Sequence, residues 1–225
     1  MAIVLDAATG AKSGGNSLTF SHTVGAALSN SLLVVAISVQ DSNHANLPIT
    51  GVTYAGVAMT KIRQDTSSTS NVSAAIYYLL SPTSGANNVV VSTTGSVWKA
   101  AVASSWSGVQ QSSQPDAQAG KGTANQSSSS PSQAITTVAN NALIVDAISS
   151  EAARTGLGSG QTSLGTQQGQ SFENLSSSYE VKVTAGSETM SATLSSGQAY
   201  NYVVASFSPS AAAVTYPSYI GGGFF

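Results

Sequence analysis

Residues 97–107 of this chain read VWKAAVASSWS, and residues 198–208 read QAYNYVVASFS. The two stretches align without a gap at an offset of 101 residues, which sets Val102 opposite Val203 and Trp106 opposite Phe207. Each is an apolar run of strand length with glycine or serine on either side. A repeat at a fixed offset indicates that the chain contains two similar halves.

The same register extends over a longer part of both halves. Further pairs at the offset of 101 are Tyr78 with Tyr179, Leu80 with Val181, Gly85 with Gly186 and Val89 with Met190. A second block, residues 30–38 against 141–149, matches at an offset of 111. Because strand and turn positions keep one register, duplication explains these matches better than a shared serine-rich composition does.

Short apolar or alternating runs recur along the whole chain, separated by glycine, serine, asparagine and proline, and none shows a sustained helical period. This pattern predicts an all-β protein. The candidate strands are residues 3–6, 18–24, 32–40, 49–54, 57–62, 73–80, 88–92, 97–107, 133–138, 142–149, 177–183, 189–194 and 200–207.

Two of these strands indicate where the core lies. Residues 32–39 are apolar on both alternating faces, which predicts a central strand with neighbours on both sides. In residues 97–107 one face carries Trp98, Ala100, Val102 and Trp106, and the other carries small or polar side chains. We therefore assign the tryptophan face to the core and not to a sugar-stacking surface.

We expect a two-sheet antiparallel β-sandwich, jelly-roll-like, with an internal pseudo-duplication. Residues 1–209 would form it from two halves, about 15–109 and 132–209, joined by a polar linker at 110–131. Two tandem immunoglobulin-like sandwiches, split near residue 112, are the alternative. The single sandwich is favoured because the second half shows no counterparts to both 49–54 and 57–62, and residues 152–172 look like an extended polar loop.

Composition excludes several classes of partner. Only 7% of residues are charged, against about 25% in an average protein, and the net charge is −2. Nucleic acid and anionic bilayers bind cationic surfaces, so neither is an expected partner. The sequence shows no cysteine, no secretory signal and no apolar run long enough to span a bilayer, which predicts a chain without membrane insertion.

The ionisable residues show no catalytic or metal-binding pattern. His22 and His44 lack a cysteine or acidic partner at ligand spacing, and residues 41–44 lack the later glycine and glutamate of a calcium loop. Asp146 interrupts an apolar strand, where a carboxylate is more often held by hydroxyls or a basic side chain than used in catalysis.

Paired carboxylates are the remaining catalytic hypothesis. Glu173 with Glu180, or Glu180 with Glu188, could lie at the spacing of a glycosidase pair, but no motif selects them. Glu180 and Lys182 alternate with apolar residues, which is typical of a solvated strand face. We predict no catalytic residue, no cofactor and no metal site, and hence no enzyme.

The end of the sequence is unusually rich in aromatic residues. Residues 210–225, here called the arm, carry Tyr216, Tyr219, Ile220, Phe224 and Phe225 on a chain jointed by glycine and proline. Left free, such residues would expose a sticky surface. We predict that these five residues form a subunit interface.

Three further segments carry a resemblance to a known family. Residues 51–60 read GVTYAGVAMT, residues 77–85 read YYLLSPTSG, and residues 106–109 read WSGV. Together they resemble a β-sandwich module of tailed-bacteriophage virion proteins that also occurs in bacterial surface proteins. The similarity covers roughly residues 15–210, and the module implies no catalytic residues.

This resemblance implies a non-enzymatic structural protein of a bacteriophage virion, either a capsid decoration or cement subunit or a tail or fibre subunit. Its partners would be other copies of itself and other virion proteins, with a host-surface glycan as a further candidate, and it would be assembled in the host cytoplasm. The alternative function is a carbohydrate-binding module or a surface adhesin, placed outside the cell or on its surface. A glycosidase or esterase is a more distant third hypothesis.

Overall fold

The computed structural model describes residues 1–40, 49–66, 72–121, 127–168 and 174–211. Within these ranges the chain forms strands and no helix, and therefore no helix that could cross a membrane. The strands are β1 (Val4–Ser13), β2 (Ser17–Val24), β3 (Leu32–Gln40), β4 (Ile49–Tyr54), β5 (Val57–Ala58), β6 (Thr60–Thr66), β7 (Val72–Leu80), β8 (Gly85–Thr93), β9 (Trp98–Ser107), β10 (Ala117–Lys121), β11 (Ser127–Ser128), β12 (Ser132–Thr137), β13 (Ala142–Ser150), β14 (Arg154–Leu157), β15 (Thr162–Gln168), β16 (Asn174–Lys182), β17 (Gly186–Leu194) and β18 (Gln198–Phe207).

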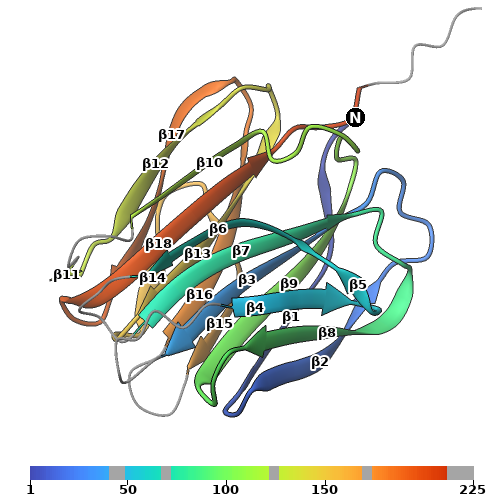
Figure 1. Ribbon diagram of the computed structural model, residues 1–225. Helices are drawn as coiled ribbons and strands as arrows, with labels where there is room; N and C mark the ends of the chain where they lie inside the picture. Colours follow the sequence, from blue (N-terminus) through green and yellow to red (C-terminus); the bar gives the residue numbers. More distant parts are fainter. Residues whose placement is uncertain (41–48, 67–71, 122–126, 169–173, 212–225) are drawn as a thin grey trace, which may run out of the picture.

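Each half folds into its own antiparallel sandwich. In the first half the inner sheet has the order β1-β9-β3-β7-β6 and the outer sheet β2-β8-β4-β5. In the second half the inner sheet has the order β10-β18-β13-β16-β15 and the outer sheet β12-β17-β14. The chain alternates between its two sheets, and this strand order is that of a jelly roll. The all-β, antiparallel, duplicated fold is thus confirmed (Figure 1).

The described chain contains four sheets, whereas we expected two halves sharing two sheets. The expectation that the second half has too few strands was wrong, because residues 152–172 contain β14 and β15 and are not one extended loop. β14 pairs with β17 as β4 pairs with β8, and β15 pairs with β16 as β6 pairs with β7. Residues 110–131 likewise contain β10, an edge strand of the second inner sheet.

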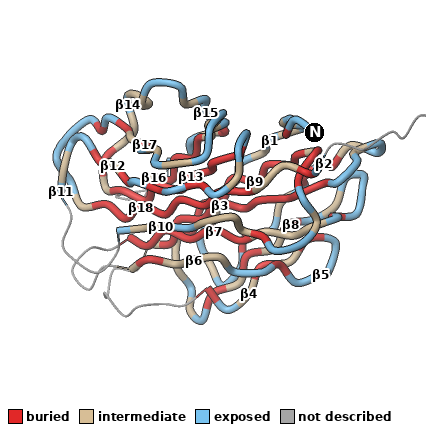
Figure 2. The backbone as a smooth tube through the Cα atoms, turned by 90° about the horizontal axis from the view of Figure 1, so that it is seen from above, coloured by how far each residue is buried: buried red, intermediate tan, exposed pale blue. Residues whose placement is uncertain are grey.

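Three apolar clusters hold the four layers together. One lies between the sheets of the first half, one between the sheets of the second half, and the third between the two inner sheets. Leu32 and Val34 of β3 face the other half, while Leu33 and Val35 face the outer sheet of their own half. The predicted central strand is therefore buried on both faces, as Figure 2 shows for the middle of the molecule.

The two inner sheets meet through reciprocal contacts between equivalent residues. Trp106 packs edge-on against Tyr179, with ring centroids 4.9 Å apart, and the equivalent pair, Phe207 and Tyr78, packs at 5.9 Å. Ser38 and Ser149, which are equivalent at the offset of 111, share a 2.5 Å hydrogen bond in the buried interface. Such self-complementary contacts are those of a twofold dimer, here within one chain.

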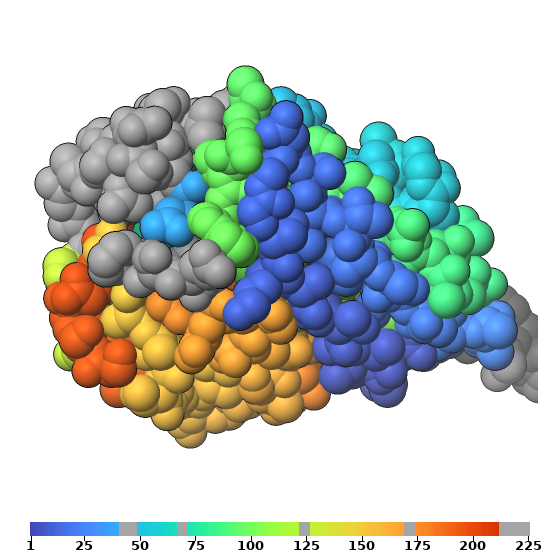
Figure 3. Space-filling model, turned by 90° about the horizontal axis from the view of Figure 1, so that it is seen from below, coloured from blue at the N-terminus to red at the C-terminus, as the bar shows by residue number. Residues whose placement is uncertain are grey.

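Two glycines repeat this symmetry at the sheet edges. Gly10 of β1 lies opposite Val102, and Gly120 of β10 lies opposite the equivalent Val203. A Cβ on Gly10 would collide with Gln167 of β15, and one on Gly120 would collide with Asp65 and Arg63 of β6. The absence of a side chain thus lets the edge strands of the two halves approach each other, and Figure 3 shows the N-terminal segment against the second half.

Candidate functional site

Asp146, on β13 between the two sheets of the second half, is a fully buried ionisable group. Its side chain is fully buried at the position where the first half carries Val35. Oδ1 accepts a hydrogen bond from the Ser178 amide at 2.6 Å. Oδ2 accepts from the Ser178 hydroxyl at 2.8 Å, from the Tyr202 hydroxyl at 2.9 Å and from the Gln161 amide at 3.4 Å.

Burial raises the pKa of Asp146 to about 6, and the hydrogen bonds from Ser178 and Tyr202 and the charge of Arg154 offset part of that rise. Burial, followed by the nearby Asp146 carboxylate, also raises the pKa of Tyr202 well above its ordinary value. Every donor around the carboxylate is a fixed protein group. The hypothesis that Asp146 is held by hydroxyls is therefore confirmed, and the cluster joins β13, β16 and β18 instead of presenting a reactive group.

A second polar cluster surrounds His22 at the edge of the first half. His22 is 1% exposed; its Nδ1 lies 3.1 Å from the Thr9 hydroxyl, and its Nε2 lies 3.1 Å from the Ser105 hydroxyl. Ser105 donates at 2.6 Å to Oδ2 of Asp6, which also accepts from the Gly25 amide. Burial lowers the pKa of His22, and the negative charge of Asp6 opposes that shift.

These residue types occur in serine hydrolases, but their order here is different. In a catalytic triad the histidine accepts the serine proton, and the carboxylate binds the far side of the imidazole. Here the Ser105 hydroxyl donates its hydrogen bond to Asp6, so Nε2 of the neutral imidazole donates to Ser105 and Nδ1 accepts from Thr9. The serine is also fully buried. The arrangement fixes the edge strands β1 and β2 onto β9 and does not activate a nucleophile.

Sequence reasoning missed this cluster because its members are far apart in the chain. His22 and Ser105 are separated by 83 residues, and Asp6 and Ser105 by 99. Three strands bring them together, and no local motif marks any of them. His44 and residues 41–44, which lack the full pattern of a calcium loop, lie outside the described residues.

Of the carboxylates considered as a glycosidase pair, Glu188 is held in an ion pair. Glu188 forms a 2.7 Å ion pair with Lys182, which lowers the pKa of Glu188. Burial and the charge of Glu188 raise the pKa of Glu180. Glu173 lies outside the described residues. Among the residues that the structure describes, no three histidines, cysteines or carboxylates come close enough to hold a metal ion.

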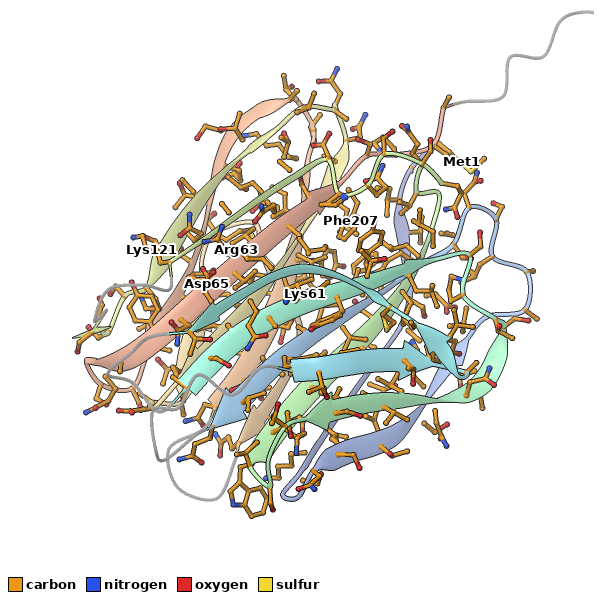
Figure 4. All side chains as sticks on the ribbon, in the orientation of Figure 1. Met1, Lys61, Arg63, Asp65, Lys121 and Phe207 are labelled. Carbon is orange, nitrogen blue, oxygen red and sulfur yellow. The ribbon has the colours of Figure 1, made fainter. Side chains whose placement is uncertain are left out.

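A third group of charges lies where the two halves meet. Arg63 and Asp65 of β6 form a 2.7 Å ion pair, and Arg63 also donates to Gln118 of β10 at 3.3 Å. Figure 4 shows these side chains near Lys121, at the seam between β6 and β10. Because the arginine bridges both halves, the cluster contributes to their contact.

The two tryptophans differ in their environments. Trp106 is 1% exposed and belongs to the core between the inner sheets, as predicted. Trp98, which we also assigned to the core, is half-buried at the start of β9, beside Gly14 in the turn between β1 and β2. The strand begins there, so the inner sheets no longer cover its side chain.

The feature most suggestive of a partner is an apolar surface at one end of the molecule. Six large apolar side chains are exposed in the described chain: Met1, Val4, Val57, Val138, Val181 and Val183. All except Val57 lie on or within three residues of the lining of one open hollow. That hollow is formed by Met1, Ala2, Ile3, Asn141, Val181 and Pro209. We call these five exposed residues, together with the hollow, the end surface.

The last described residues run along this surface. Val109 and Pro209 form a β-bridge, Ser210 donates its amide proton to the Gly108 carbonyl at 2.7 Å, and the Met1 nitrogen donates to the Ser210 carbonyl at 2.6 Å. The predicted interface residues, Tyr216, Tyr219, Ile220, Phe224 and Phe225, lie outside the described residues. The last described residues therefore lie beside the hollow.

The fold and these sites define a class: a duplicated jelly-roll protein whose buried polar clusters are bonded internally. No family model, no curated protein and no solved structure matches the chain.

Proposed function

We propose that this protein is a non-enzymatic structural subunit that associates with copies of itself in the virion of a tailed bacteriophage. Within the particle it serves as a capsid decoration or cement subunit, or as a tail or fibre subunit. It is assembled in the host cytoplasm and contacts other virion proteins.

The observation that carries this proposal is the end surface. Two of the six exposed large apolar side chains, Met1 and Val181, line its hollow, and three more lie within three residues of the lining, in a chain with few charges. Concentrated apolar surface of this kind usually marks a contact with another macromolecule. A subunit that repeats in an assembly needs such a contact, and a solitary enzyme does not.

The polar clusters also support a structural role. The carboxylate of Asp146 and the imidazole of His22 each have hydrogen-bond partners from the protein on every polar atom. Both clusters tie neighbouring strands together. A general acid or base, in contrast, needs access to a substrate proton.

The segments that resemble the virion module have structural roles in this fold. Residues 51–60 contain the turn between β4 and β5, where Ala55 and Gly56 have positive φ values. Residues 77–85 complete β7 and lead into β8, and residues 106–109 end β9 at the bridge to Pro209. The resemblance therefore concerns turns and core positions, in agreement with a module that carries no catalytic site.

Quantitative mass spectrometry of purified particles tests this proposal. Particles from a culture that produces the protein should contain it at high copy number, in fixed ratio to the major capsid or tail protein. Its presence in the lysate but absence from washed particles would overturn the proposal.

A glycan-binding role has one observation in its favour, the half-buried indole of Trp98. An indole with one open face can stack on a sugar ring. Binding on a glycan array that disappears in Trp98→Ala, and persists in a variant of the end surface such as Val181→Asp, would establish this second function.

A further inference from the structure

The hollow in the end surface has the size and lining of a site for a large apolar side chain. It encloses about 380 Å³ and lies where the start of the chain, the turn before β13 and the end of β16 come together. Its lining contains one polar side chain, Asn141, and Met1, whose charged amino group donates a hydrogen bond to the Ser210 carbonyl. Figure 4 shows Met1 at this end of the molecule.

The exposed side chains around the hollow extend this apolar surface. Met1 is 54% exposed, and Val183, whose carbonyl accepts a hydrogen bond from the Asn141 amide, is 69% exposed. Val138, three residues before Asn141, is 75% exposed. Covering these side chains would remove substantial apolar area from water, at about 25 cal/mol for each square ångström.

The arm has the matching chemistry. Its residues beyond Ala211 read AAVTYPSYIGGGFF, with four aromatic side chains, one isoleucine and no charge. Extended, these 14 residues span about 45 Å. Uncharged aromatic residues fit the apolar part of this lining, which Ile3, Val181 and Pro209 provide.

The start of the arm indicates which copy of the chain it serves. Pro209 lines the hollow itself, so an arm that bound its own hollow would have to reverse direction at once. Residues 211–215 contain neither glycine nor proline, and the first glycines after Pro209 are residues 221–223. The hollow of a second copy requires no such reversal.

We propose that the hollow of one copy receives the aromatic arm of a second copy, with Val181, Met1 and Pro209 contacting the inserted rings. This inference rests on the self-association in the proposed function and names its contact. Because arm and hollow are different surfaces, the contact is heterologous. Two copies that exchange arms form a closed dimer, and copies that each pass the arm to the next copy form an open chain of subunits.

Mixing two complementary variants tests this inference. One variant lacks residues 216–225 and keeps the hollow; the other carries Val181→Asp, which places a charge in the hollow and keeps the arm. Sedimentation velocity should show each variant alone as a monomer, with 22.5 kDa for the full-length chain and less for the shortened one. Their mixture should sediment at the sum of the two monomer masses. The unmodified chain should associate by itself.

Two further variants make the test specific. Val57→Asp changes an exposed valine of β5 outside the hollow, and it should associate like the unmodified chain. Ala2→Asp changes an exposed lining residue, so it should reproduce Val181→Asp even if the strand substitution disturbs β16. The β-type circular dichroism of each variant establishes that it is folded.

Three results would overturn the inference: a mixture that stays monomeric, a chain without residues 216–225 that still associates, or folded hollow variants that associate normally. If any of these results is obtained while the protein is found at high copy number in particles, the proposed contact between arm and hollow is wrong and the proposed function stands. Absence from particles would remove the function itself.

Discussion

At the scale of single residues, Asp146 and Gly108 carry the most specific consequences. Asp146 keeps a carboxylate in an apolar layer where its counterpart in the first half is a valine. Gly108 has a φ of 80°, and a Cβ there would collide with the carbonyl oxygen of Ala2. Asp146 makes the stability of the fold depend on pH, and Gly108 fixes how the start of the chain crosses the end of β9.

The pKa of Asp146, about 6 in the folded protein against an ordinary value of 3.8, makes stability fall as pH rises. Well below pH 3.8 the group is protonated in both states and costs nothing. Between pH 4 and 6 it ionises in the unfolded chain first, so about 3 kcal/mol of stability is lost by pH 7. Urea unfolding at pH 4 and 7 should show this loss, and Asp146→Asn should abolish it.

Glu188 supplies a control of opposite sign. Its pKa is lowered by Lys182, so its contribution is present at neutral pH and is lost as pH falls through the folded pKa. Glu188→Gln should therefore remove a contribution that grows with pH. An Asp146→Asn protein that keeps the full pH dependence of the unmodified chain would contradict the assignment.

Gly108→Ala should lower the free energy of unfolding by about 1–3 kcal/mol for the left-handed backbone, and further because the Ala2 carbonyl must move. Gly56→Ala is the matched control, since Gly56 has a φ of 78° and open space around its Cα. Chemical denaturation should show Gly108→Ala as the more damaging change. Equal losses would mean that the contact with Ala2 does not constrain the fold.

At the scale of elements, the apolar strands were predictable and the polar edge strands were not. β3 and β13 are buried on both faces. The apolar residues on both alternating faces of 32–39 are enough to predict that burial for β3, whereas Asp146 interrupts the apolar run of β13. β14 reads RTGL and β15 reads TSLGTQQ, with a bulge at Gly165. Such strands form by backbone pairing with a neighbour, which composition does not record.

The contacts within the polar clusters also divide into those that the sequence predicts and those that it does not. The hydroxyl partners of Asp146 were anticipated in kind, because an unpaired carboxylate in an apolar strand is too costly. The pairing of Ser105 with Asp6 and His22 depends on the register of separate strands. The sequence duplication indicated two similar halves, but it did not show that the equivalent serines Ser38 and Ser149 touch each other.

That serine pair gives a prediction at the element scale. Ser38→Ala or Ser149→Ala alone leaves the other hydroxyl buried without its partner. Each single variant should therefore lose more than half of the free energy of unfolding that the double variant loses. A double-mutant cycle should give a coupling of about 1 kcal/mol. A coupling near zero would show that the two inner sheets do not meet at this position.

At the scale of the whole molecule, the two halves should behave as one unit. Their inner sheets share an apolar cluster that includes Val34, Trp106, Val145 and Phe207. Neither inner sheet is covered on both faces without the other half. Unfolding one half therefore exposes apolar surface on its neighbour.

Phe207→Ala tests this cooperativity. Removing the ring that packs against Tyr78 of the other half should cost about 3–5 kcal/mol and lower Tm by on the order of 10 °C. Calorimetry should still record a single transition, because both halves lose the shared contact together. Two separate transitions, only one of them shifted, would show independent halves.

The central claim concerns the end surface and its role in a repeated assembly. Cryo-electron microscopy of purified particles tests it most directly. The account predicts many copies of the four-layer fold, each with density from a neighbouring copy seated against Met1, Val181 and Pro209. Particles that lack the fold, or that carry it with this end open to solvent, would contradict the account.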